Sequence, residues 1–242
     1  MSAIAAPASA GRVGPFDVEP WPERLACHVV DPGPIRRVHG YGVSFDLALH
    51  AGPLEVAWLA FQGELPGPGA RAALSTALVL LAPIHAGEAP AHAAILARIA
   101  GAPAHLLPAI AAVALGELSR IEHARLAPLR RWLDTREGPI PEVARAIDPS
   151  PEEERAHREI ASASARWLGD RALPASPALD RVALAHALLH LLGLDELTVH
   201  TLSVGARLPA VLAEARCVEA AAVRAYPARL PDYAYLEDGA LP

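Results

Sequence analysis

The chain has 242 residues, a formal net charge of −6 and a hydrophobic fraction of 52%, much of which is alanine and leucine. It contains no lysine, which excludes Schiff-base chemistry at a lysine and a phosphate-binding loop of the usual lysine-containing type. The acidic balance, and the lack of a basic run accompanied by aromatic side chains, argue against nucleic-acid binding.

Alanine and leucine favour helix, and the β-branched residues that favour strands are sparse, so the composition predicts an all-α protein. Residues 1–20 are expected to be disordered. Trp21–Pro34 is expected to be extended, because its prolines discourage helix. The expected helices are Leu54–Gly63, Gly69–Ala82, Ala89–Ile99, Ala104–Ile121, Ala124–Leu133, Glu152–Leu168, Ala178–Leu192, Asp195–Ala213 and Val218–Ala225.

Two of these helices have informative ends. Ser150 followed by Pro151 and two glutamates is typical of a helix start, with proline in the first position and acidic residues in the first turn. Ala178–Leu192 is apolar on almost every side, which predicts a deeply buried helix that ends at Gly193. The segment Thr135–Ile147, with R-E-G-P-I-P, is expected to be a loop.

The cysteine count and the N-terminal sequence suggest a location. Cys27 and Cys217 are too few for a metal framework, so no metal or other resident cofactor is expected. The first residues lack a basic region followed by a long apolar core, and no uninterrupted run of about 18 apolar residues is present. The sequence therefore predicts a cytoplasmic protein that does not engage a membrane.

Several polar residues could carry chemistry, and each also has a structural interpretation. His85 lies at a break between two apolar helices, where it could be catalytic or simply occupy a turn. Asp180 begins an apolar helix, where it could be a base or a cap that binds the helix N-terminus. His186 and His190 have a metal-ligand spacing, but no third ligand is visible, so core or boundary histidines are favoured.

Five short motifs, in order, resemble those of citrate synthases and citryl-CoA lyases over roughly residues 21–238. The turn H-G-Y-G and the following segment that ends in G-E-L-P, within Arg37–Pro66, resemble the entry segment of that family. His85 stands where the family has a catalytic histidine in a D-H-E turn, and Asp180 stands at the aspartate of its N-[IV]-D-G signature. L-S-V-G-A-R-L-P resembles the helix whose arginine binds a substrate carboxylate, which would be Arg207 here.

The resemblance implies an all-α, citrate-synthase-like fold and an intimate homodimer. A large helical domain would comprise residues 21–88 and 186–242, with a smaller helical domain, 89–185, inserted between them. The active site would lie in the cleft between the domains and would bind a small carboxylate, with acyl-CoA as a candidate substrate. Arg229 or Arg224, near the C-terminus, would reach the active site of the partner subunit.

The departures from the family are chemically informative. Arg145 stands where the family has its second catalytic histidine, and Ser150 replaces a ligand-binding arginine. Glu142 and Ala144 replace two glycines. His123 matches the histidine of the family's G-P-L-H-G-G-A segment, a substrate-binding position, but the glycines around it are gone.

In the family, the aspartate removes a proton beside the thioester, the first histidine stabilises the enol, and the second histidine exchanges a proton with the other carbonyl. Arginine stays protonated, because its pKa is above about 12, so Arg145 could only stabilise negative charge. The expectation is a diverged acyltransferase or carbon–carbon lyase performing enolate chemistry, with Asp180 as base and His85 as enol stabiliser, on a substrate other than acetyl-CoA plus oxaloacetate. The alternatives are an inactive paralogue that binds a carboxylate metabolite or pairs with an active subunit, and a purely structural helical dimer.

Overall fold

The computed structural model describes residues 27–31, 33–175 and 177–217. The chain forms two compact units, the first ending at Leu65 and the second beginning at Pro66. The division into a larger domain and an inserted smaller domain, expected from the family resemblance, stays a prediction. The expected helix Val218–Ala225 lies outside the described residues.

The first unit begins with a small antiparallel sheet that the composition did not predict. Its strands are β1 (Val30–Asp31), β2 (Arg37–Val38) and β3 (Tyr41–Gly42), paired in the order β1-β2-β3. Val38 pairs with Tyr41, so His39 and Gly40 form a two-residue hairpin loop, and both have positive φ, 45° and 89°. That conformation is the one favoured for a tight hairpin and explains the glycine of the H-G-Y-G motif.

A helical segment follows the sheet. It comprises a π-helical turn (Val43–Leu47), α1 (Ala48–His50) and α2 (Pro53–Gln62). Pro53 sits in the first turn of α2, where its missing N–H costs nothing. Gly63 ends the helix in a left-handed conformation, φ 80°, as the G-E-L-P motif predicts.

In the described part of the second unit, the regular secondary structure is helical apart from one isolated β-bridge. Its helices are α3 (Pro68–Leu81), α4 (Ala89–Ile99), α5 (Leu107–Arg125), α6 (Ala127–Thr135), α7 (Pro151–Leu168), α8 (Arg181–Leu191) and α9 (Glu196–Arg216). Three 3₁₀ turns, Ala104–Leu106, Glu142–Ala144 and Gly169–Arg171, lie between them. The all-α class predicted from composition is therefore confirmed.

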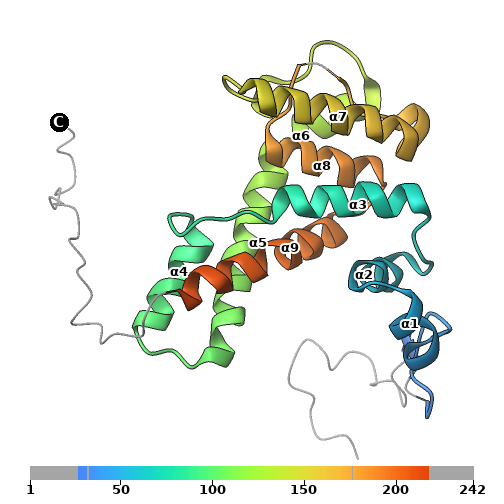
Figure 1. Cartoon of the computed structure of the whole chain (residues 1–242), viewed down its shortest axis with the longest axis vertical. Helices are drawn as coiled ribbons and strands as arrows, with labels where there is room; N and C mark the ends of the chain where they lie inside the picture. The colour runs from blue at the N-terminus through green and yellow to red at the C-terminus, as the bar shows by residue number, and fades with distance from the viewer. Residues whose placement is uncertain (1–26, 32, 176, 218–242) are drawn as a thin grey trace, which may run out of the picture. The chain divides into compact units, whose positions relative to one another are not determined.

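Within this unit, α3 lies beside α8 and α9, and α5 runs from α6 at one end to α4 at the other (Figure 1). The helix α8 is buried on nearly every side, as its all-round apolar sequence predicts, and Leu188 and Leu189 are fully inaccessible. A second apolar cluster forms where α4, α5 and the end of α9 meet.

Helix boundaries follow local chemistry. The expected break between α5 and α6 was placed at residues 122–123, but it falls at Leu126. Pro128 explains the shift, because proline is tolerated in the first turn of a helix and not in its interior. Ser150 caps α7 by accepting a hydrogen bond from the Glu153 amide, while the Glu153 side chain accepts from the Ser150 amide.

Among the described residues, the helical stretch 104–125 is long and apolar enough to cross a membrane by length and composition. The core helix of a soluble protein meets the same description. Here α5 contacts α4 and α9, and 22% of its most apolar 18-residue window is buried.

Candidate functional site

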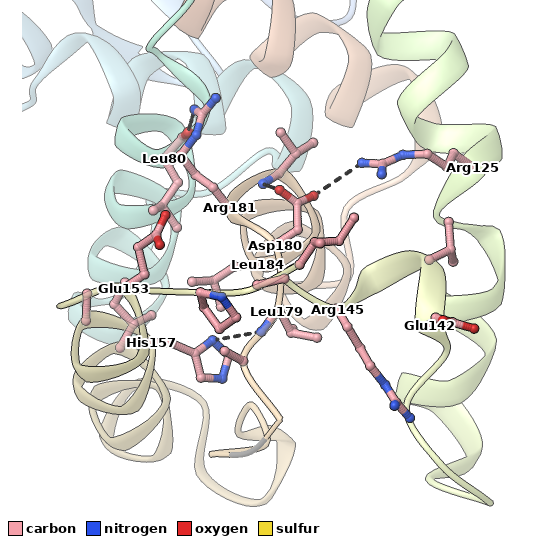
Figure 2. A pocket seen from close by; sticks show the side chains of 18 residues that line it. Leu80, Arg125, Glu142, Arg145, Glu153, His157, Leu179, Asp180, Arg181 and Leu184 are labelled. Atoms are coloured by element: carbon pink, nitrogen blue, oxygen red, sulfur yellow. Dashed lines mark hydrogen bonds and ion pairs between the residues drawn. The ribbon is translucent and has the colours of Figure 1, made fainter. Parts of the chain in front are cut away.

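A cavity of about 790 Å³ lies in the second unit at the N-terminus of α8. Most of its wall comes from the loop 142–149, from α7 and from residues 178–184 at the start of α8, and Leu80 of α3 and Arg125 of α5 complete it (Figure 2). The lining is largely apolar, with charged side chains interspersed. Those charged side chains are Arg125, Glu142, Arg145, Glu153, Asp180 and Arg181.

Asp180 occupies the N-terminus of α8 and lines this cavity. Its carboxylate accepts hydrogen bonds from the amides of Val182 and Ala183, at 3.4 and 3.3 Å, so the capping role predicted for it is present. The Oδ2 atom also lies 3.3 Å from Nη2 of Arg125. The side chain is still 34% exposed, so the carboxylate is capped and paired but also accessible from the cavity.

Short backbone pairing holds the segment of Asp180 against the segment of Arg145. The Asp180 amide donates to the carbonyl of Ala144 at 2.9 Å, and the Ala146 amide donates to the carbonyl of Ala178 at 3.0 Å. These bonds flank an antiparallel bridge between Arg145 and Leu179. Two of the three residues expected to be catalytic, Arg145 and Asp180, are therefore brought to one cavity.

The guanidinium of Arg145 is engaged elsewhere. Its Nε and Nη2 atoms both donate to the carbonyl oxygen of Ile140, at 3.0 and 2.7 Å. Figure 2 shows the side chain directed away from the Asp180 carboxylate. In this arrangement the guanidinium fixes the loop that forms one wall of the cavity.

His85, the third residue expected to be catalytic, is not part of the cavity wall. It lies in the turn between α3 and α4 with its side chain 78% exposed. Its Nδ1 accepts a hydrogen bond from the Gly87 amide at 3.1 Å. The structure thus gives His85 the local turn contact that was the alternative interpretation of this residue.

His157 also lines the cavity, although no sequence motif pointed to it. It is buried on α7, where Nδ1 accepts from the Leu179 amide at 3.3 Å and Nε2 faces the Pro174 carbonyl at 3.0 Å. These partners place the ring proton on Nε2, and burial lowers the pKa of His157, so the ring is neutral. Helical spacing could have indicated that His157 is buried, because it lies on the same face of α7 as Ala161 and Ser164, which are also buried.

A second polar group lies between α5, α8 and α9, and it contains the predicted ligand-binding residues Arg207 and His123. Nη2 of Arg207 donates to Oε1 of Glu122 at 2.8 Å, and Nε2 of His186 lies 3.7 Å from the other carboxylate oxygen. His123 packs its ring against that of His200, with centroids 5.1 Å apart. None of these residues lines the cavity at α8.

His123 is held neutral by its surroundings. Burial, followed by the positive charge of Arg130, lowers the pKa of His123 from 6.5 to about 4. A neutral imidazole whose Nδ1 is buried without a partner fits a packed side chain. It can neither carry positive charge nor repel Arg130 at neutral pH.

We expect His123 to make the fold sensitive to mild acid. Because its pKa is lower in the folded chain, the unfolded chain binds the proton first as the pH falls below 6.5, and stability is lost progressively toward pH 4. Urea unfolding at pH 7.5 and 5.5 measures this loss before most carboxylates titrate. The variant His123→Gln should lose less stability over the same interval, and an equal loss would contradict the assignment.

Three further predictions concern the C-terminal arginines, metal binding and the pair of His186 and His190. Arg229 and Arg224 lie outside the described residues. In the described part of the chain, no group of three or more histidine, cysteine, aspartate or glutamate side chains is arranged to hold a metal ion. His190 of the spaced pair bonds Asp134 at 2.7 Å, while His186 faces Glu122, so the two histidines have different partners.

No protein-family model matches the sequence, and no curated protein matches it. Among solved structures, the chain is similar to citryl-CoA lyase from Hydrogenobacter thermophilus, with a TM-score of 0.58 and 17% sequence identity, over 90% of this chain and 97% of that one. At this identity the likeness shows the fold, and the five short motifs predicted the same fold. The protein therefore has the all-α, citrate-synthase-like fold of citryl-CoA lyase.

Proposed function

We propose that the protein is a diverged member of the citrate synthase superfamily that binds a carboxylate or acyl-thioester ligand in the cavity at α8 and forms its enolate. The observation that carries this proposal is the position of Asp180. The residue that matches the family's base lies on the wall of the cavity, with its carboxylate partly exposed. A carboxylate held in this way can accept a proton from a carbon next to a carbonyl.

The cavity suits an amphipathic ligand. Its volume of about 790 Å³ falls within the range usual for small-molecule sites, roughly 300–1,000 Å³. Apolar surface for an acyl group comes from Leu80, Ile160 and Leu184. Positive charge near the N-terminus of α8 comes from Arg125 and Arg181. The charges of Glu142 and Glu153 partly offset those arginines, which favours a ligand of low net charge at this end.

We expect the step that makes or breaks the carbon–carbon bond to be slow. Making or breaking the carbon–carbon bond needs a group that exchanges a proton with the other carbonyl. Arg145 cannot do this at neutral pH, and its guanidinium is already bonded to Ile140. Loss of such a general acid or base typically costs about 10²–10⁴-fold in rate. We therefore expect proton exchange to be faster than condensation or cleavage.

Deuterium exchange tests this function directly. Acetyl-CoA and a longer straight-chain acyl-CoA are incubated with the protein in D₂O, and loss of the α-proton signal is followed by NMR. Asp180→Asn should reduce the exchange rate by about 10²–10⁴-fold, because asparagine still caps the helix but cannot take the proton.

The matched control is Asp195→Asn. Asp195 caps α9 in the same way, accepting from the Thr198 amide at 2.7 Å, but it does not line the cavity. This variant should exchange at the wild-type rate. Equal losses in the two variants would mean that the exchange depends on a negative charge at a helix N-terminus, and not on proton transfer to Asp180.

A second candidate is a protein that binds the ligand without transforming it. The exposed position of His85, outside the cavity, favours it, because the enol then lacks its expected stabiliser. Ligand-dependent thermal stabilisation without α-proton exchange would select this candidate. From the resemblance alone, we also propose that the protein is a cytoplasmic homodimer.

A further inference from the structure

Three charged or titratable side chains meet in the interior of the second unit, one from each of three helices. They are Glu122 of α5, His186 of α8 and Arg207 of α9. Arg207 is only 3% exposed, and Glu122 and His186 are also buried. Burying an arginine and a glutamate costs free energy unless their opposite charges pair. The contact of Arg207 with Glu122 at 2.8 Å offsets that cost.

The hydrogen bonding of this group is incomplete. Arginine and carboxylate usually pair through two parallel bonds, but here Arg207 and Glu122 share one. Nη1 of Arg207 and Oε2 of Glu122 are buried with no hydrogen-bond partner, and so are both ring nitrogens of His186. The group therefore has more donors and acceptors than its own members use.

The carboxylate is ionised in this position. Burial by itself raises the pKa of Glu122, but the His186 ring and the Arg207 charge outweigh that effect and hold the pKa below its usual value. The negative charge on Glu122 neutralises Arg207. The arginine expected to bind a substrate carboxylate is thus already occupied by a carboxylate of its own chain.

We infer that Glu122 is an internal ligand of Arg207, and that it masks a site for a short free carboxylate between α5, α8 and α9. The guanidinium of Arg207 and the His186 ring form this site, and the side chain of Glu122 fills it. A free carboxylate reaches Arg207 only if Glu122 is displaced or removed. The site is separate from the cavity of Asp180, so neither proposal depends on the other.

The atoms that Glu122 contributes determine which small molecule can be used to probe the site. Replacing Glu122 with alanine removes one methylene and the carboxylate, and the free molecule with those atoms is acetate. Acetate should therefore fit the space left by Glu122→Ala, and it carries the charge that Arg207 then lacks. Acetamide has the same shape without the charge and should not replace it.

Thermal unfolding at pH 7.5 tests the inference. Glu122→Ala should lower Tm by on the order of 10 °C, because it leaves Arg207 buried and unpaired. Sodium acetate should then raise the Tm of this variant by several degrees over sodium chloride of equal ionic strength, as expected for a ligand that binds only the folded state. Acetamide should have no such effect, and acetate should leave the wild type unchanged.

Glu117→Ala is the matched control. Glu117 lies on the same helix and pairs with Arg120 at 2.6 Å, but both side chains are exposed. Acetate should not change the Tm of this variant, because water already replaces the lost carboxylate. An equal acetate response in both variants would show a general salt effect and would overturn the inference.

A refolding measurement covers the case in which Glu122→Ala does not fold in chloride. The denatured variant is diluted into acetate or chloride, and the recovery of helical circular dichroism is compared. Recovery in acetate only supports the masked site. Recovery in neither salt, or to the same extent in both, overturns it.

Discussion

Arg207→Ala should lower the free energy of unfolding by about 3–5 kcal/mol, the usual cost of leaving one member of a buried ion pair without its partner. Glu122 would keep its charge in a buried position with only the neighbouring His186, 3.7 Å away. Urea unfolding followed by circular dichroism measures the change. A loss below about 1 kcal/mol would mean that water reaches Glu122 and that the pair is not buried as described.

The pair can also be removed as a whole. In Glu122→Leu combined with Arg207→Met, no charge is left without a partner, and such double replacements are often neutral or stabilising. The double variant should therefore be closer in stability to the wild type than Arg207→Ala is. Arg120→Ala, which breaks the exposed pair with Glu117, should change stability little and serves as the surface control.

His157→Ala is the second change for which we expect a large effect, a loss of about 2–4 kcal/mol. The ring is 3% exposed, so its removal leaves a cavity. It also leaves the Leu179 amide and the Pro174 carbonyl without their partner. Because Leu179 directly precedes Asp180, the wall of the ligand cavity should loosen, and ligand-induced thermal stabilisation should fall as well.

Two further variants show whether the loss in His157→Ala comes from its hydrogen bonds and its burial. His157→Asn keeps an acceptor near the position of Nδ1 and should recover part of the stability if the bond to the Leu179 amide matters. His105→Ala removes an exposed histidine from the 3₁₀ turn before α5 and should have little effect. If His157→Ala were as stable as the wild type, His157 would not be the residue that holds the segment before Asp180.

The helices could be predicted from the sequence because their causes are local. Pro151 after Ser150, and Gly63 and Gly193 after apolar stretches, mark boundaries through backbone geometry alone. The all-round apolar character of α8 predicted its burial, since a helix without a polar side must be covered. The ordered short motifs then predicted which fold these helices build, and the structural likeness to citryl-CoA lyase confirms it.

The candidate site could be predicted only in part. The family resemblance implied that Asp180 and Arg145 lie in one site, and backbone pairing between their segments brings both to one cavity. The same resemblance placed His85 with them, but the turn that holds His85 leaves its side chain in solvent. A motif match places a residue along the chain but does not specify where the turn that carries it directs the side chain.

Sequence by itself thus predicted most of the helices and the burial of α8, and the family resemblance of its motifs predicted the fold that the helices form. Only the tertiary structure decided which polar groups meet, such as Glu122 with Arg207, 85 positions apart, and His157 with Leu179, 22 apart. The physical reason is that periodicity shows which side of a helix is buried but not which helix covers it. Hydrogen bonds and charge neutralisation depend on a few ångströms between those helices, a distance set by the packing of the whole unit.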